Sequence, residues 1–235
     1  MPRRRSKPKK KRAARPPSHR RLRSGEARAA LLFAAVEEFA AHGVAGTPIS
    51  RITAVAGARN SSALNYHFGS KRGLVEQLIV LIQSWFDEAR NRHLEIMEAR
   101  VADGNPPRLR EALDIFVRPY AKLITEEPWG LAAIRFIATL EFEQHPDGWD
   151  LVYKHTSSVA QRLCDLVAAV TGDDPDGSGK RRLLFYFDSV IHGFAAHKHL
   201  GVSFFGDVQV PSVDKLADFY VQCGERLLTF AASSA

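Results

Sequence analysis

Apolar residues recur at helical spacing along most of the chain from residue 24 onward. In the first such stretch, the apolar positions 32, 35, 36 and 39 are spaced i, i+3, i+4 and i+7, which places them on one face of a helix. Eight further stretches follow the same period. None shows the strict apolar–polar alternation of a strand, and no internal repeat is present. The pattern predicts an all-α chain with nine helices.

Glycine, proline and capping residues set the predicted helix boundaries. Gly43 ends the first helix. Thr47 is placed to cap the second helix, with Pro48 at the first helical position, where a missing N–H costs nothing. Ser70 caps a long fourth helix. We therefore predict helices over residues 24–43, 48–56, 60–67, 71–102, 108–126, 129–144, 148–171, 180–201 and 212–231.

The segment 47–72 has the layout of a helix-turn-helix. Its two short helices are joined through Ala56 and Gly57, and the second ends just before the cap of the long fourth helix. In such a motif one helix crosses the DNA backbone and the next enters the major groove. Helix pairs with glycine turns are common, so the layout alone is a weak indication of DNA binding.

Charge is distributed unevenly along the chain. The first 23 residues contain 12 of the 33 lysines and arginines and no acidic residue, so the rest of the chain holds 21 basic and 26 acidic residues. Four prolines among these charges leave too little apolar surface to offset chain entropy, and we predict that residues 1–23 are disordered. The segment predicts an arm that binds nucleic acid or another anionic surface. A solvated, nonspecific tail is the alternative, and composition leaves a transit peptide open.

The remaining chemistry is sparse. Cys164 and Cys223 are far apart, which excludes a disulfide framework and indicates a reducing, cytoplasmic setting. The most apolar early run, residues 29–41, is too short to cross a membrane and contains two glutamates. No catalytic or phosphate-loop motif occurs, so neither an enzyme nor a cofactor is predicted. The histidines of residues 192–199 lack i, i+4 spacing and a local carboxylate, so no metal site is predicted.

The segment 27–78 resembles the TetR/AcrR-type family of dimeric, ligand-responsive transcriptional repressors. With the nine-helix layout, the resemblance implies a helix-turn-helix domain over residues 24–70 and a helical ligand-binding and dimerisation domain over residues 71–235. Residues 58–65 are one residue longer than the commonest family pattern. Phe33 and Glu38 exchange the usual polar and apolar preferences of the first helix, and Phe33 is placed to pack against the arm or the fourth helix. The resemblance rests on Leu31, Leu32, Ala35, Val36, Phe39, Gly43, Thr47, Ile52, Ala56, Gly57, Tyr66, His67, Phe68, Ser70, Lys71 and Leu74.

The third helix is the expected reader of DNA bases. Short polar side chains near its start suit base edges, and the family's matching positions hold phosphates on both sides of the groove. The alternatives are that the serines only cap the helix, that Tyr66 and His67 pack against the first helix, and that Arg59 is solvated. We expect base contacts from Asn60, Ser61, Ser62 and Asn65, a guanine or phosphate contact from Arg59, and phosphate contacts from Thr47, Tyr66, His67 and Lys71.

The resemblance also implies a homodimer and an effector cavity. The eighth and ninth helices would form a four-helix dimer interface, although their apolar residues also suit the core of one chain. Helices four to eight would enclose the cavity, and core packing is the alternative for each aromatic residue there. The candidate effector contacts are Trp85, Phe116, Tyr120, Trp129, Phe136, Phe142 and His192, with Arg135 and Glu141 as further polar candidates.

These features together predict a sequence-specific transcriptional regulator. It would be a repressor that a small, largely apolar effector releases from a pseudo-palindromic, double-stranded DNA operator. Two alternatives stay open. One is a nonspecific DNA-binding protein driven by the basic arm, and the other is a small-molecule-binding protein that retains the helix-turn-helix.

Overall fold

The computed structural model describes residues 24–58, 62–142, 148–172, 178–199, 202–203, 206–207 and 209–229. The predicted disorder of residues 1–23 lies outside this part of the chain. The described residues form nine α-helices, one 3₁₀ turn and one short β pair, which confirms the predicted all-α fold. The elements are α1 (Ser24–Gly46), α2 (Ile49–Val55), α3 (Ser62–Phe68), α4 (Lys71–Ala102), α5 (Leu109–Glu126), α6 (Gly130–Phe142), α7 (Gly148–Thr171), α8 (Ser178–Ala196), η1 (His197–His199), β1 (Val202–Ser203), β2 (Gly206–Asp207) and α9 (Val213–Thr229).

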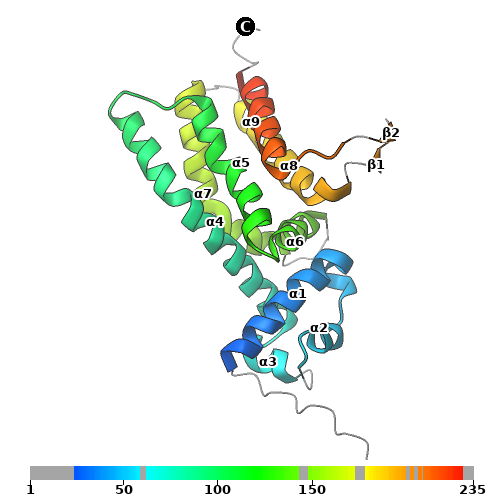
Figure 1. Cartoon of the computed structure of the whole chain (residues 1–235). Coiled ribbons are helices and arrows are strands. Elements are labelled where there is room, and N and C mark those ends of the chain that lie inside the picture. The colour runs from blue at the N-terminus through cyan, green and yellow to red at the C-terminus, as the bar shows by residue number, and fades with distance from the viewer. Residues whose placement is uncertain are drawn as a thin grey trace, which may run out of the picture.

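Helices α1, α2 and α3 gather at one end of the molecule, and α4 runs from that end into a bundle of the remaining helices (Figure 1). By length and composition, α1 could cross a membrane. Its apolar stripe is instead buried in the core through Leu31, Ala35 and Phe39, against α2, α4 and α6. The apolar composition of α1 therefore matches its place in the core.

Local backbone signals explain the boundaries of the N-terminal helices. Gly43 has φ 72° and ψ 164°, so the regular part of α1 breaks where the sequence predicts. The Ser70 side chain accepts a hydrogen bond of 3.0 Å from the backbone N–H of Gly73 and caps α4. Helix α4 has 32 residues and is therefore about 48 Å long. It connects the N-terminal helices to the far end of the bundle.

The bundle is built from three principal helix pairs, in which α5 packs on α9, α4 on α7, and α6 on α8. Two glycines allow close approach around α8 and α9. A Cβ at Gly193 would overlap the Tyr220 hydroxyl, and a Cβ at Gly224 would lie 2.7 Å from the Tyr186 ring. A charged pair adds to the α4–α7 contact, where Arg162 donates to both oxygens of Glu98 at 2.8 Å.

The end of α8 differs from the predicted helix over 180–201. The α-helix ends at Ala196, a 3₁₀ turn follows, and Val202–Ser203 pairs with Gly206–Asp207 in an antiparallel arrangement. The His197 ring bonds to the carbonyl oxygen of Pro211, 3.0 Å away. That contact ties the turn after α8 to the entry of α9, and it joins residues 14 positions apart, beyond the reach of helical periodicity. Local periodicity could not reveal it.

Candidate DNA-binding surface and effector core

The helix-turn-helix is formed by α2, a glycine turn and α3. Gly57 has φ 67°, a left-handed conformation that suits glycine, and the Ala58 N–H donates to the Thr53 carbonyl at 2.8 Å. Ile52 of α2 and Leu64 of α3 are fully buried. Helix α2 packs on α1, and α3 packs on α4. This packing fixes α3 against the rest of the N-terminal end.

The outward face of α3 carries polar and aromatic side chains. Ser62, Asn65 and Tyr66 are exposed, while Leu64 is buried beneath them. Tyr66 is 81% exposed, so the alternative that it packs against α1 does not hold. His67 is half-buried, and its ring meets the Tyr66 ring edge-on with centroids 4.9 Å apart. Arg59, Asn60 and Ser61, which are also expected to contact DNA, lie outside the described residues.

Thr47 has a different role from the predicted one. It does not cap α2, because the residue before the helix is Pro48 and no side-chain cap bond forms. Its side chain is fully buried, and its hydroxyl lies 2.7 Å from the Gly43 carbonyl oxygen and 3.2 Å from that of Glu38. The hydroxyl therefore stabilises the broken end of α1. A phosphate contact by this side chain would require those bonds to break, and we leave Thr47 out of the DNA-contact set.

Lys71 is the first residue of α4 and lies beside the recognition helix. Its Nζ is 5.9 Å from the centroid of the buried Phe39 ring. The long apolar stem can pack against the core while the ammonium group stays near the surface. The start of α4 also presents backbone N–H groups and the positive end of the helix dipole. This position suits a phosphate.

Both sequence departures in α1 have partners in the structure. The Glu38 carboxylate forms an ion pair with Arg51, which joins α1 to α2, and it also lies 3.4 Å from the His42 ring. Phe33 packs on Trp129 with ring centroids 6.1 Å apart, a partner other than the arm and the fourth helix that the sequence suggested. Each of these two residues thus contacts a residue outside α1.

Residues 31–78 match the model for bacterial regulatory proteins of the tetR family, a segment that spans α1 to the first part of α4. Residues 31–78 are thus an N-terminal domain of the tetR-family type. The domain is a DNA-binding helix-turn-helix, and the chain is a DNA-binding regulator. No curated protein matches the sequence.

Solved structures of TetR-family proteins share their fold with most of this chain. A protein described as a TetR-family regulator from Rhodococcus sp. is 18% identical, with a TM-score of 0.54 over 87% of this chain and 99% of that one. A counterpart from Shewanella sp. PV-4 is 16% identical, with a TM-score of 0.55 over 87% and 97%. NalD, the secondary repressor of the MexAB-OprM multidrug efflux pump in Pseudomonas aeruginosa, is 18% identical, with a TM-score of 0.54 over 86% and 95%. At this identity, the likeness shows a shared fold.

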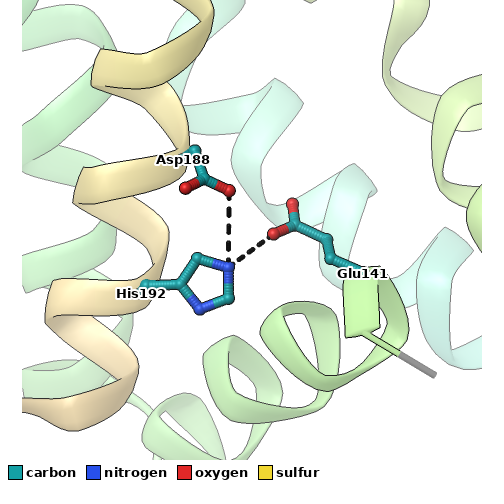
Figure 2. A group of neighbouring side chains, drawn as sticks. All are labelled: Glu141, Asp188 and His192. Atoms are coloured by element: carbon teal, nitrogen blue, oxygen red, sulfur yellow. Dashed lines mark hydrogen bonds and ion pairs between the residues drawn. The ribbon is translucent and has the colours of Figure 1, made fainter.

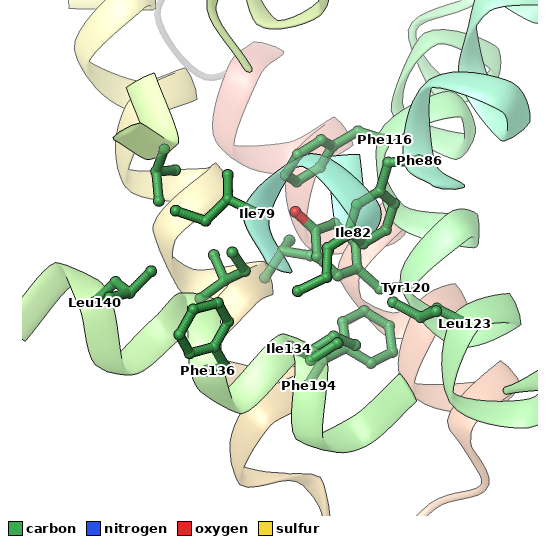
Figure 3. Packing of buried hydrophobic residues seen from close by; sticks show 14 of the residues in the cluster. Ile79, Ile82, Phe86, Phe116, Tyr120, Leu123, Ile134, Phe136, Leu140 and Phe194 are labelled. Atoms are coloured by element: carbon green, nitrogen blue, oxygen red, sulfur yellow. The ribbon is translucent and has the colours of Figure 1, made fainter. Parts of the chain in front are cut away.

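An aromatic cluster fills the TetR-type bundle between α4, α5 and α8 (Figure 3). Phe116 stacks on Phe187 with centroids 4.0 Å apart, and Tyr120 stacks on Phe194 at 5.6 Å. Phe86 lies 4.8 Å from the Tyr120 ring. Two predicted effector contacts, Phe116 and Tyr120, are therefore at the centre of this cluster. A third, Trp85, packs edge-on against Phe86 at its border.

Arg90 lies in the same cluster, and the sequence pattern does not reveal it. It is 7% exposed, and its guanidinium carbon is 4.4, 5.2 and 5.4 Å from the ring centroids of Phe86, Phe116 and Tyr120. Its Nη2 donates to the Phe116 carbonyl at 3.2 Å. Among the described residues, no hydrogen-bond partner reaches its Nε and no carboxylate lies within ion-pair distance, but the guanidinium also interacts with the Tyr120 hydroxyl and with the charge of Asp87 on the same helix. A buried guanidinium without a directly paired carboxylate could pair with an acidic group of a ligand.

The other predicted effector contacts lie elsewhere. Phe136 is fully buried and stacks on Phe39 of α1 with centroids 5.7 Å apart and a 22° interplanar angle. Trp129, in the turn just before α6, packs on Phe33, so both aromatics join this part of the bundle to the N-terminal end. The side chain of Phe142 lies outside the described residues. His192 is beside Glu141 and Asp188, which corrects the expectation of no local carboxylate, since Asp188 precedes it by four residues.

A small cleft lies between α1, α6 and η1. Its volume is about 190 Å³, and Glu37, Arg135 and Lys198 supply its charged groups. That volume is below the range of about 300–1,000 Å³ typical of sites for drug-sized ligands. The cleft contains none of the predicted aromatic contacts. The aromatic cluster around Arg90 is thus the better candidate for an effector site.

Helices α8 and α9 expose several large apolar residues. Leu183, Val190 and Leu216 are buried within the chain, so part of the predicted dimer face belongs to its own core. Four other large apolar residues of these helices face outward. The exposed set is Leu184 and Phe185 on α8 and Phe219 and Leu227 on α9.

Proposed function

We propose that this chain is a transcriptional repressor that binds a pseudo-palindromic operator as a homodimer and is released by a small effector. The exposed face of α3 carries the proposal, because Ser62, Asn65 and Tyr66 face outward from a fixed helix in a TetR-type domain. Such a regulator acts in the cytoplasm, where it meets the DNA. The arm at residues 1–23 would add phosphate contacts beside those of α3.

The proposed dimer forms through α8 and α9. Four large apolar side chains exposed on two neighbouring helices are more than a monomer leaves to water without a reason. Two copies joined there would present two recognition helices, which suits half-sites about one DNA turn apart. The dimer would therefore read an operator with two-fold symmetry.

The proposed effector is largely apolar, aromatic or otherwise flat, and carries one acidic group. Its flat part would replace contacts among Phe86, Phe116 and Tyr120, and its acid would pair with Arg90. The aromatic cluster lies between α4, which starts beside α3, and α8, which packs on α6. Effector binding would thus favour a conformation in which the recognition helices no longer match the operator spacing.

A binding-site selection on random duplexes with the full-length protein at near-physiological salt tests the proposal. We expect enrichment of a pseudo-palindrome. Tight, salt-sensitive binding without enrichment would favour the arm-driven, nonspecific alternative, which the cluster of basic residues in 1–23 supports. Weak binding to every duplex would favour the small-molecule-binding alternative.

Replacing Asn65 and Lys71 should separate base reading from phosphate binding. Asn65→Ala is expected to change the preferred base at one position of each half-site, with about 1–3 kcal/mol of lost discrimination. Lys71→Ala is expected to weaken binding to all sequences similarly and to lower the salt slope by about 0.9. Selection and fluorescence titrations measure both effects. Lys122→Ala, at an exposed lysine on α5, is the control, and an unchanged base preference in Asn65→Ala would defeat that assignment.

Arg90→Met should remove the preference for acidic effectors while the fold is kept. Methionine fills a similar space, and replacing a poorly paired buried charge by an apolar group is often neutral or stabilising. We expect the apparent affinity for aromatic carboxylates, relative to that for their neutral amides, to fall at least about tenfold, because hydrogen bonds to charged groups contribute about 1.5–3 kcal/mol. Thermal stabilisation of the protein by each compound measures this affinity. Arg100→Met, which removes a half-exposed arginine of the same helix, should leave the preference intact. Equal preference in the Arg90 variant and the control would rule out Arg90 as the anchor.

A further inference from the structure

Three metal-ligating side chains converge where α6 meets α8. Glu141 comes from α6, and Asp188 and His192 come from α8 (Figure 2). The His192 Nε2 lies 2.6 Å from Glu141 Oε2 and 3.5 Å from Asp188 Oδ1. One donor atom from each residue lies within 4.8 Å of the other two. The sequence hides this group because two of its members are on one helix and the third is 47 residues away.

The backbone explains why these donors point to one place. Asp188 and His192 are four residues apart on α8, so their side chains lie on the same face of that helix. Helix α6 packs on α8, and Glu141 is in its last turn. Two carboxylates and an imidazole are thereby presented from two rigid helices. Binding sites built on helices hold their geometry better than sites on loops.

The charges of the group favour a cation. Burial raises the pKa of Glu141, the neighbouring His192 opposes the rise, and the charge of Asp188 adds to it. Two carboxylates this close repel each other unless a proton or a cation lies between them. Asp188 is 56% exposed on its side chain and Glu141 only 14%, so the group is open to solvent on one side and enclosed on the other. An ion could enter from the Asp188 side.

We propose that Glu141, Asp188 and His192 bind one divalent first-row transition-metal ion, such as Zn²⁺. Around a tetrahedral ion with bonds of about 2.0–2.1 Å, donor atoms are about 3.3 Å apart. The His192–Asp188 distance is already close to this value, and Glu141 would have to move away from His192 by about 0.7 Å. Three protein ligands would leave a fourth position for water or an added ligand. Binding would displace any proton held by the group, so affinity should rise with pH.

The proposed site would fix α6 against α8. Helix α6 also carries Phe136, which stacks on Phe39 of the N-terminal domain. A metal ion at the end of α6 would thus constrain the helix that joins the bundle to α1. The metal site does not depend on the proposed repressor function, and its test uses no DNA.

The test is metal binding by the full-length protein after extraction with a chelator. Zn²⁺ is titrated calorimetrically, and Co²⁺ is titrated by its visible absorption, which reports the ligand set directly. We expect one site per chain in the wild type and at least about 100-fold weaker binding in His192→Gln and Asp188→Asn, because even changes to the residues behind the ligands cost about 10–100-fold. Asp188 is exposed, so Asp188→Asn tests the site with little risk to folding. Circular dichroism in the presence of the chelator checks that both variants are folded.

His155→Gln is the matched control. His155 also faces a glutamate across two helices, at 3.4 Å from Glu76, but among the described residues no third ligand of this kind completes a group there. It should bind Zn²⁺ and Co²⁺ like the wild type. No site in the wild type, equal loss in the control, or full binding in His192→Gln would overturn the proposal and leave Glu141 and His192 as an ion pair between helices.

Discussion

Deleting residues 2–22 is expected to weaken binding to duplex DNA by about two orders of magnitude or more at about 150 mM salt. Nearly all of the 12 cations of the arm lie in this segment, and each phosphate that they neutralise contributes about 0.9 to the slope of log affinity against log salt. If half of them reach a phosphate, the slope falls by about 5 on deletion. Anisotropy titrations between about 50 and 200 mM salt measure both quantities.

A second variant separates charge from length in the arm. Replacing its lysines and arginines by glutamine keeps the segment but removes the charge, and it should reproduce the flattened slope. If the arm also enters the minor groove, both variants lose preference for A·T-rich flanks, because a narrow minor groove attracts arginine. A slope equal to that of the wild type would show that the arm makes no phosphate contacts. The preference encoded by α3 should survive in either variant.

The helices of this fold could be predicted where local signals decide their ends. Ser70 and the turn after Ala102 bound α4 at residues 71–102 as predicted, and α7 matches the predicted 148–171. Caps, glycines and prolines act within a few residues and are visible in sequence. The end of α8 at Ala196 was not predicted, and there the His197 ring contacts the Pro211 carbonyl at the entry of α9. Such contacts follow from tertiary packing alone.

Among the candidate site residues, too, some could be predicted from local sequence, and others are placed by tertiary packing. The exposed face of α3 was predicted from the short polar residues near the start of the helix, and Ser62 and Asn65 are exposed around the buried Leu64. Thr47 was misassigned, because a threonine before a proline has the signature of a cap even when its hydroxyl bonds back to α1. In the sequence, Arg90 resembles any solvated basic residue on a long helix. The packing of α5 on α4 buries it. Phe136 was expected in an effector cavity, whereas the pairing of α6 with α1 places it beside Phe39.

Phe136→Ala is expected to destabilise the folded protein by about 3–5 kcal/mol, the usual cost of removing a fully buried phenylalanine. The loss includes the stacked contact with Phe39 and leaves a cavity between α1 and α6. Urea unfolding followed by circular dichroism measures the change in the free energy of unfolding. Tyr153→Ala is the control, because that aromatic is 67% exposed and should change stability by no more than about 0.5 kcal/mol.

The milder Phe136→Leu tests whether this contact also carries the response to the effector. Leucine keeps much of the buried volume, so the variant should stay folded with a loss of about 1.5 kcal/mol or less. If α6 transmits effector binding to α1 through the pair of rings, effector affinity should be retained while its effect on operator affinity falls several-fold. That ratio is the coupling between the two sites, and it must be the same whichever ligand is added first. Unchanged coupling in a folded Phe136→Leu protein would leave α4, which also contacts α1, as the connection between the bundle and the recognition helix.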